Sequence, residues 1–289
     1  MNAAAVDEIR AAVESLGIDV RSISAVAGGD ISAAFRVECG DGRELFVKSG
    51  EPGVLTAEAK GLKALSDAAH ALIVPHPAAY CETEEGASLL VLEWLERVGP
   101  TEDYWVSLGR GLAALHGTSA EQYGFHKDNY IGRRPQPNEW CSSWVEFFAE
   151  RRLEPQVRWL KDTGFWELSW STRYANLCRR LPELIADQPL ASLVHGDLWA
   201  GNAMATTAGP AVVDPAVYYG DREVDLAMTE LFGGFSPVFY AAYREAFPLD
   251  AGYARRRDLY NLYHLLNHLN HFGSKYAGSV DRALRELGR

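Results

Sequence analysis

Residues 193–215 read LVHGDLWAGNAMATTAGPAVVDP and hold three polar residues in an ordered spacing. Asp197 follows a short apolar run, Asn202 comes five residues after it, and Asp214 ends a second apolar run. Short apolar runs flanked by turn-forming residues are typical of buried strands. The stretch therefore predicts a loop that carries a carboxylate and an amide, followed by a strand that ends in a second carboxylate.

The catalytic loop of protein kinases carries such groups at this spacing. A kinase catalytic loop needs an Asp that accepts the proton of the acceptor hydroxyl, an Asn five residues later that binds one Mg²⁺, and an Asp beyond the next hairpin that binds the other. Asp197, Asn202 and Asp214 fit these roles in order. The base must face the acceptor while the metal ligands face the triphosphate, so a loop has to separate them. The alternative is that Asp197 and Asp214 only cap turns.

Longer stretches around this loop resemble one protein family. HGDLWAGN, DPAVYYGDREVDLAMTELFGGF (residues 214–235) and LYHLLNHLNHFGSKY (262–276) are similar to the fructosamine kinase and ketosamine-3-kinase family, which belongs with the aminoglycoside phosphotransferases in the protein-kinase-like superfamily. A looser similarity covers nearly the whole chain. The resemblance implies a bilobal α+β fold, with a small antiparallel sheet that covers ATP (residues 1–97) and a larger, mainly helical lobe that carries the catalytic loop and the acceptor (98–289).

The resemblance also implies a reaction. The γ-phosphoryl group of ATP would pass, with Mg²⁺, to the 3-hydroxyl of a ketosamine such as fructosamine or ribulosamine, and this would destabilise the adduct and so deglycate the amine. The partner would be a small glycated amine or a glycated lysine of a protein. Two alternatives stay open, namely a phosphotransferase that acts on an aminoglycoside, choline or homoserine, and a nucleotide-binding pseudokinase. The pseudokinase is disfavoured because every chemical position is occupied.

The first hundred residues supply the groups expected around the nucleotide. Short β-type runs at 23–27, 34–38 and 44–48 surround the loop GGDIS, whose Gly28, Gly29 and Ser32 we expect beside the phosphates because glycines let the backbone approach them. Lys48 ends the third run, where the kinase plan places the phosphate-binding lysine. Glu58, near the start of a predicted helix (54–69), is the best candidate to hold Lys48, although a carboxylate there also suits the helix dipole alone.

Two further strands, at about 79–82 and 88–94, lead to the predicted hinge between the lobes. We expect the backbone of Glu93 and Leu95 to bind the adenine edge. Main-chain recognition leaves little trace in side chains, so this assignment depends on position. Predicted helices fill the rest of the chain, at 104–116, 144–160, 165–181, 237–247, 255–272 and 279–287.

Several C-terminal residues are candidates for substrate binding and support. Trp199 either stacks on a sugar or packs beneath the catalytic loop. His264, His268 and His271 share one helix face, and we expect either structural histidines or sugar-binding groups rather than a metal site; His268 is the substrate candidate. Asp225, at a helix start, is expected to hydrogen-bond the catalytic-loop backbone. The irregular segment 123–140 either borders the acceptor site or is a plain surface loop.

Composition limits the partners. The chain has 289 residues, 47% hydrophobic, and can bury a full core. Its net charge of −11 argues against nucleic acid and suits a small neutral or cationic ligand better than a polyanion. Its four cysteines are widely spaced, and no stretch of about 18 uncharged apolar residues occurs, so we expect a cytoplasmic protein with no membrane partner. The oligomeric state and the preferred ketosamine stay open.

Overall fold

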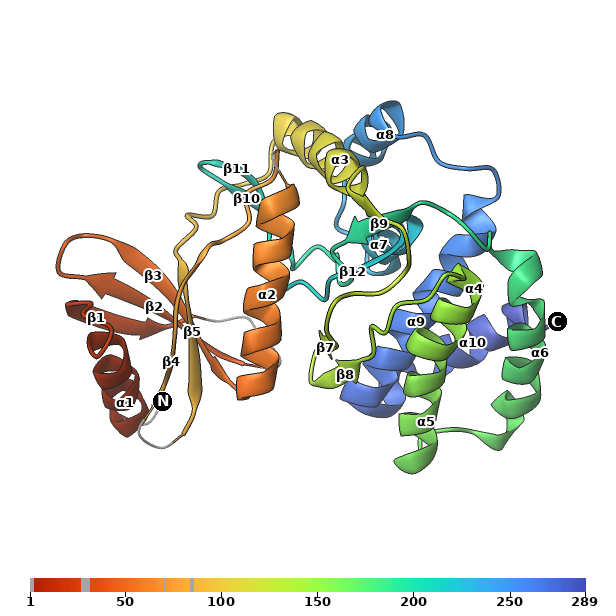
Figure 1. The fold of residues 1–289 in the computed structure, drawn as a ribbon, viewed down its shortest axis with the longest axis horizontal. Helices are drawn as coiled ribbons and strands as arrows, with labels where there is room; N and C mark the ends of the chain where they lie inside the picture. The colour runs from red at the N-terminus through yellow and green to blue at the C-terminus, as the bar shows by residue number, and fades with distance from the viewer. Residues whose placement is uncertain (1–2, 27–31, 70, 84–85) are drawn as a thin grey trace.

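The computed structural model describes residues 3–26, 32–69, 71–83 and 86–289, and Figure 1 shows how these are arranged. A sheet and two helices form the N-terminal half, and the C-terminal half is mainly helical. The predicted α+β class, with an antiparallel sheet and a larger helical part, is confirmed. Gly28 and Gly29 of the predicted phosphate loop lie outside the described residues.

The main sheet is antiparallel, with strand order β1-β2-β3-β5-β4. Its strands are β1 (Val20–Ala25), β2 (Ala33–Cys39), β3 (Glu44–Gly50), β4 (Pro77–Glu82) and β5 (Ser88–Glu93). Helix α1 (Ala3–Glu14) and helix α2 (Pro52–Ala68) pack on the sheet. Alternate residues of β5 enter different cores: Leu89 and Val91 join the core that includes α1, and Leu90 and Leu92 join the core that includes α2. This interior strand of the sheet is therefore buried on both faces.

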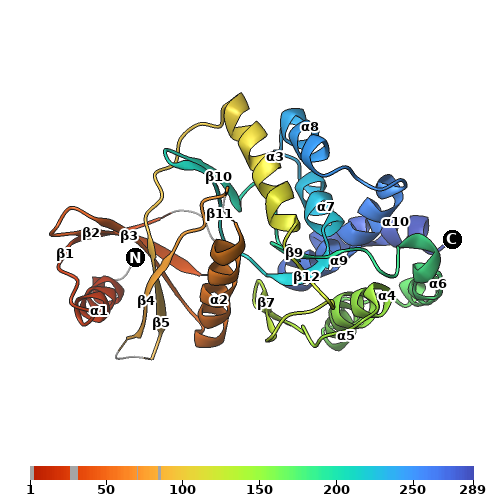
Figure 2. The ribbon, with the colours of Figure 1, turned by 45° about the horizontal axis from the view of Figure 1, so that its top comes forward.

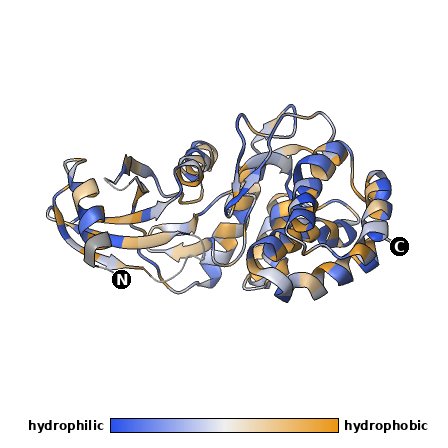
Figure 3. Ribbon diagram, turned by 90° about the horizontal axis from the view of Figure 1, so that it is seen from below, coloured by the Kyte–Doolittle hydropathy of each residue, from blue (hydrophilic) through white to orange (hydrophobic). Residues whose placement is uncertain are grey.

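The second core extends without interruption from α2 into the C-terminal half. That half contains α3 (Glu102–His116), α4 (Trp144–Phe147), α5 (Glu154–Asp162), α6 (Leu168–Leu184), α7 (Glu223–Leu231), α8 (Pro237–Ala246), α9 (Tyr253–Phe272), the 3₁₀ turn η2 (Gly273–Tyr276) and α10 (Ala277–Leu287). Figure 3 shows hydrophobic segments along both the strands of the sheet and the C-terminal helices. Within the described residues, no helix is long and apolar enough to cross a bilayer.

Short strands position the polar loops of this half. They are β6 (Ser119–Ala120), β7 (Asn129–Ile131), β8 (Arg134–Gln136), β9 (Ala191–Val194), β10 (Ala203–Thr206), β11 (Gly209–Val212) and β12 (Tyr218–Asp221). The pairs β7–β8 and β10–β11 are hairpins, and β9 lies between β12 and β6. The predicted loop after residue 194 thus joins β9 to β10, and Asp214 follows β11.

The β10–β11 hairpin connects the two halves. Ile73 forms two backbone hydrogen bonds with this hairpin: its N–H donates to Pro210 O, and its carbonyl accepts from Val212 N. Near the predicted hinge, Val98 N donates to Ala205 O at 2.9 Å. Figures 1 and 2 show the hairpin between the sheet and α3. The boundary between residues 97 and 98 stays a prediction.

One predicted helix is divided. The expected helix 144–160 consists of α4, a π-helical segment η1 (Phe148–Leu153) and α5. Pro155 has no N–H to donate to the carbonyl of Arg151, and Arg152 Nη1 donates to that carbonyl instead, at 3.0 Å. The wider turn also brings the Arg152 side chain inward, where it is fully buried against Tyr218. Hydrophobic periodicity could not reveal this change of helical type.

Candidate active site

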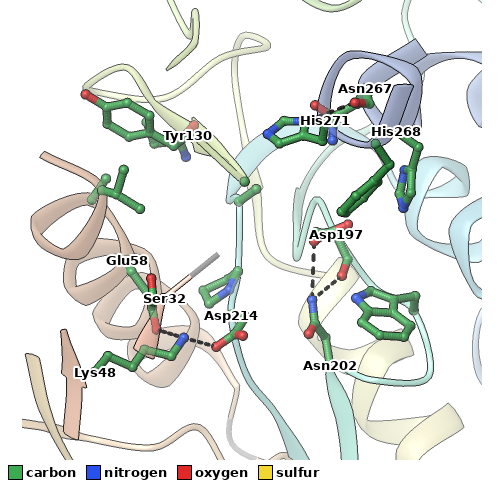
Figure 4. Close-up of a pocket in the computed structure, with 18 of the residues that line it drawn as sticks. Ser32, Lys48, Glu58, Tyr130, Asp197, Asn202, Asp214, Asn267, His268 and His271 are labelled. Carbon is green, nitrogen blue, oxygen red and sulfur yellow. Dashed lines mark hydrogen bonds and ion pairs between the residues drawn. The ribbon is translucent and has the colours of Figure 1, made fainter. Parts of the chain in front are cut away.

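A cavity of about 450 Å³ lies between the two halves, and Figure 4 shows most of its lining. It brings together the predicted site residues Ser32, Lys48, Glu58, Asp197, Trp199, Asn202, Asp214 and His268. Three of them come from the N-terminal half and five from the C-terminal half. The segment 123–140, left open as a surface loop or a border of the acceptor site, contributes lining residues through the β7–β8 hairpin.

Lys48 is the centre of the nucleotide end. Its buried ammonium donates to Glu58 Oε1 at 2.7 Å and also contacts Asp214 Oδ1. Burial disfavours the charged lysine, but Asp214 and Glu58 outweigh this and raise the pKa of Lys48. The ion pair expected between Lys48 and Glu58 is thus present, and Lys48 is also paired with the predicted metal ligand.

The turn before Asp197 depends on glycine. Gly196 has φ +83°, and a Cβ at this position would lie 2.1 Å from the Ala216 carbonyl oxygen, so no larger residue fits. The carboxylate of Asp225 accepts from His195 N at 2.7 Å and from Gly196 N at 2.9 Å. Both contacts are the ones expected of Asp225, and together they hold the backbone that presents Asp197.

His195 joins the loop to the strand that delivers Asp214. Its Nε2–H donates to Val213 O at 2.9 Å, so its Nδ1 is the acceptor for Asp197 N, at 3.3 Å. Burial lowers the pKa of His195, which keeps the ring neutral and this tautomer in place. His195 was not singled out from the sequence, although it stands next to the recognised Gly and Asp.

Asp197 and Asn202 face each other across the loop (Figure 4). Asn202 Nδ2 donates to Asp197 O at 2.9 Å and approaches Asp197 Oδ2 at 3.3 Å. Burial, then the charges of Asp214 and Asp225, raise the pKa of Asp197 to about 7. A carboxylate with a pKa near neutrality is suited to general-base work.

Asp214 has φ 56° and is the single non-glycine residue with a positive φ in the described part of the chain. This conformation costs roughly 1–2 kcal/mol for an L-residue, although Asp tolerates it better than most. Strain of this kind is common at functional sites. It directs a half-exposed carboxylate into the cavity.

Oxygen ligands suited to Mg²⁺ are present. Mg²⁺ in phosphoryl-transfer sites is typically held by one or two protein ligands with phosphates and water. Asp214 offers a carboxylate, and Asn202 offers its amide oxygen because its nitrogen faces Asp197. Within the described residues, no group of three or more His, Cys, Asp or Glu side chains could hold a metal by itself. The donor set therefore fits a metal that arrives with the nucleotide.

The acceptor end rests on a buried amide network that the sequence did not predict. Asn129 Nδ2 donates to Val217 O at 2.7 Å, and its Oδ1 accepts from Gln136 Nε2 at 2.8 Å. Tyr263, on α9, donates to Gln136 Oε1 at 2.6 Å. The network fixes the β7–β8 hairpin, from which Tyr130 lines the cavity with its hydroxyl directed toward α2 (Figure 4).

The three histidines of α9 have different environments. His264 is buried, with a pKa lowered to about 3 by burial. His271 Nδ1–H donates to Asn267 O and its Nε2 accepts from Arg133 N, so the ring links α9 to the β7–β8 turn. His268 Nδ1–H donates to His264 O at 2.8 Å, which makes Nε2 the acceptor of the neutral ring. Of the three, His268 and His271 line the cavity.

Aromatic rings form the outer wall. Trp199 is 41% exposed, packs over Gly201 and lines the cavity, and its stacking on a sugar stays a prediction. Phe232 lies 4.8 Å from His268, between ring centroids, and Phe272 and Tyr276 continue the wall. The sequence analysis missed these last three residues, although they lie within the quoted family stretches.

The predicted hinge residues lie apart from this cavity. Neither Glu93 nor Leu95 is among its described lining residues, and the Glu93 side chain accepts from His76 N at 3.2 Å. Adenine recognition by Glu93 and Leu95 stays a prediction.

Comparison with known proteins agrees with this geometry. A family model described as fructosamine kinase matches residues 3–289. The protein named "Probable ketoamine kinase" of Synechocystis sp. is 43% identical over 278 residues, which cover 91% of this chain and 89% of the relative. A chloroplastic protein-ribulosamine 3-kinase of Arabidopsis thaliana is 36% identical over 286 residues, covering 95% and 86%.

Solved structures agree as well. One named as a fructosamine-3-kinase, from Thermobifida fusca, superposes with a TM-score of 0.87 at 32% identity and covers 98% of this chain and 97% of its own. The aminoglycoside phosphotransferase APH(4)-Ia superposes with a TM-score of 0.69 at 17% identity, covering 98% and 99%, and shows the shared kinase-like fold. The predicted resemblance is confirmed: this chain belongs to the fructosamine kinase family.

Proposed function

We propose that the protein transfers the γ-phosphoryl group of ATP to the 3-hydroxyl of a ketosamine. The observation that carries the proposal is that one cavity holds both a nucleotide end, built on Lys48, Glu58 and Asp214, and a polar and aromatic acceptor end, with Asp197 between them. Names of relatives at 43% and 36% identity favour a ketosamine acceptor.

Each residue has a separate role in the proposed reaction. Asp197 accepts the proton of the acceptor hydroxyl, and Asn202 keeps its carboxylate oriented. Lys48, held by Glu58, binds the phosphates. Mg²⁺, held by Asn202 and Asp214, would neutralise charge on the phosphates. Lys48 also contacts Asp214, so the phosphate-binding lysine and the proposed metal ligand lie side by side.

The acceptor end suits a sugar. Trp199 offers an indole face on which a sugar ring can stack, and the His268 imidazole lines the same end of the cavity. A phosphate on O3 is attached to the carbon next to the C2 carbonyl. Loss of a proton from C1 gives the 1,2-enaminol, which expels the phosphate from C3, and water then hydrolyses the resulting conjugated imine at C1 and releases the free amine. A glycated free amine and a glycated protein lysine both present this group.

An assay coupled to ADP formation tests the proposal. We expect turnover with ribulosamine, fructosamine or erythrulosamine acceptors and none with unglycated peptides. Loss of phosphate from the product on standing, and the phosphorus NMR coupling of the fresh product, identify O3 as the site. Stable phosphorylation of an aminoglycoside, with no turnover of any ketosamine, would instead place the protein with the antibiotic phosphotransferases.

A further inference from the structure

The acceptor end of the cavity carries a positive charge, although the whole chain is at −11. Three carboxylates are among the described lining residues, and two of them, Glu58 and Asp214, pair with Lys48 at the nucleotide end. The third is the proposed base, Asp197. The remaining charged group of the described lining is Lys275, at the acceptor end.

Lys275 is exposed at the rim of the cavity, and its ammonium lies near two aromatic rings. Its Nζ lies 4.8 Å from the ring centroid of Phe272 and 5.2 Å from that of Tyr276, and both rings line the cavity. Contacts of this kind favour a cation over the ring faces. Within the described residues, Lys275 has no carboxylate at ion-pair distance, so no fixed anion of the protein compensates its charge.

Two guanidinium groups add to this charge. Arg133 lies in the turn of the β7–β8 hairpin and Arg134 begins β8, and Arg133 N donates to His271 Nε2 at 3.0 Å. Burial is the main cause of the lowered pKa of His271, and the nearby positive charges of Arg134 and Arg133 lower this pKa further. The Arg134 guanidinium lies over Trp159, 5.4 Å from the ring centroid. The hairpin turn therefore places positive charge beside the same rim.

We propose that Lys275 binds an anionic group of the acceptor, with Arg133 and Arg134 adding longer-range attraction. The inference rests on the proposed function and narrows its substrate class to ketosamines that carry a carboxylate or a phosphate. A glycated free amino acid supplies a carboxylate on the amine side, and a phosphorylated sugar supplies a phosphate on the other. This proposal differs from the expectation of a neutral or cationic ligand, which was taken from the total charge of the chain.

A matched pair of acceptors tests the inference. N-ribulosyl-glycine and N-ribulosyl-glycinamide differ in the carboxylate charge, and we expect the wild type to prefer the former by about fivefold in kcat/KM, mainly through KM. Lys275→Gln should remove the preference and Lys275→Glu should invert it. Lys161→Gln is the matched control, because the Lys161 ammonium also lies over an aromatic ring, that of Trp166, but lines no described part of the cavity. The control should keep the wild-type preference.

A third acceptor, with a phosphate on C5 of the ribulose and glycinamide as the amine, separates the two sources of charge. Preference for this compound assigns the anion to the sugar side, and preference for the glycine compound assigns it to the amine side. Turnover of the neutral glycinamide compound reports the proposed function independently. Calorimetric titration of all three acceptors, with a non-hydrolysable ATP analogue present, decides the inference even without turnover. Equal affinities in the wild type, or a preference that survives Lys275→Gln, would overturn it.

Discussion

The Tyr130 hydroxyl occupies the space that a side chain at Gly53 would enter: a Cβ built on Gly53 would lie 2.8 Å from Tyr130 Oη. Gly53 is in the first turn of α2, the helix that carries Glu58. Tyr130 belongs to the β7–β8 hairpin and lines the cavity. This contact joins the helix that orients Lys48 to the loop that borders the acceptor.

The contact predicts that the effect of Gly53→Ala on stability depends on the Tyr130 hydroxyl, which a double-mutant cycle can measure. Ala is favoured over Gly in helices by up to about 1 kcal/mol, yet Gly53→Ala should not stabilise the wild type, because Tyr130 has to move away. In a Tyr130→Phe background the nearest remaining atom is the ring carbon at 3.4 Å, so Gly53→Ala should stabilise by about 0.5–1 kcal/mol. Urea unfolding of the four proteins measures this coupling. Equal effects of Gly53→Ala in both backgrounds would show that the contact between Gly53 and Tyr130 does not affect stability.

The second prediction concerns Gly196, for which Gly164 is a matched control. Both have positive φ, +83° and +75°, so an alanine at either costs roughly 1–2 kcal/mol in backbone strain. At Gly164 no atom lies within 4 Å of the added Cβ, whereas at Gly196 the Ala216 carbonyl oxygen lies 2.1 Å away. Gly164→Ala should keep full kcat. Gly196→Ala should lose at least about 10²-fold in kcat, because the displaced turn carries Asp197. Urea unfolding and acceptor kinetics on both variants decide the matter, and similar kinetics in the two would contradict the steric argument.

The polar centre of the site could be predicted because its groups are close in sequence and their chemistry fixes their order. Asp197, Asn202 and Asp214 belong to one loop and hairpin, and Lys48 with Glu58 follows from strand and helix order. The acceptor end could not be predicted in the same way. The bond from Tyr263 to Gln136 joins residues 127 positions apart, and such contacts depend on tertiary distances that local pattern does not encode.

For the fold, too, local features could be predicted from the sequence and long-range ones could not. Strands and helices with clear hydrophobic periods were found within a few residues, for example β3 and α3. The π-helical segment Phe148–Leu153 was not, because it depends on the missing N–H of Pro155 and on the side chain of Arg152, which lies inside the protein. Local pattern identifies a helix there but not its type.

The third prediction concerns stability and pH. The folded-state pKa of His264 is lowered to about 3, against about 6.5 in an unfolded chain, so the unfolded state binds more protons between these values. The free energy of unfolding should therefore fall as pH drops below about 6.5. The His264 contribution between pH 7 and pH 5 should be about 2 kcal/mol.

Urea unfolding of the wild type and His264→Gln at both pH values isolates this contribution. Asp197 is present in both proteins, and its raised pKa increases the free energy of unfolding as pH falls. Subtracting the pH dependence of His264→Gln from that of the wild type therefore cancels the contribution of Asp197. Substitution of the exposed His126 by Gln is the control and should leave the pH dependence of the wild type intact. A His264→Gln protein that loses as much stability as the wild type on acidification would show that another group is responsible.

The last prediction separates the two aspartates of the site. Asp197 faces the acceptor and has Asn202 as its hydrogen-bonded neighbour, whereas Asp214 contacts Lys48. If Asp197 acts as the base, Asp197→Asn should lower kcat by about 10²-fold or more and leave nucleotide affinity within a few-fold. Asp214→Asn should weaken Mg²⁺-nucleotide binding, because it removes a metal ligand and a partner of Lys48 together.

Calorimetric titration with a non-hydrolysable ATP analogue and Mg²⁺ distinguishes these outcomes. Asp41→Asn, at an exposed turn where the carboxylate pairs with Arg43, is the matched control and should resemble the wild type. Raising the Mg²⁺ concentration should recover part of the affinity lost in Asp214→Asn but none of the kcat lost in Asp197→Asn, because mass action restores binding and not proton transfer. If both variants lost nucleotide affinity to the same extent, the assignment of base and metal ligand to different residues would have to be abandoned.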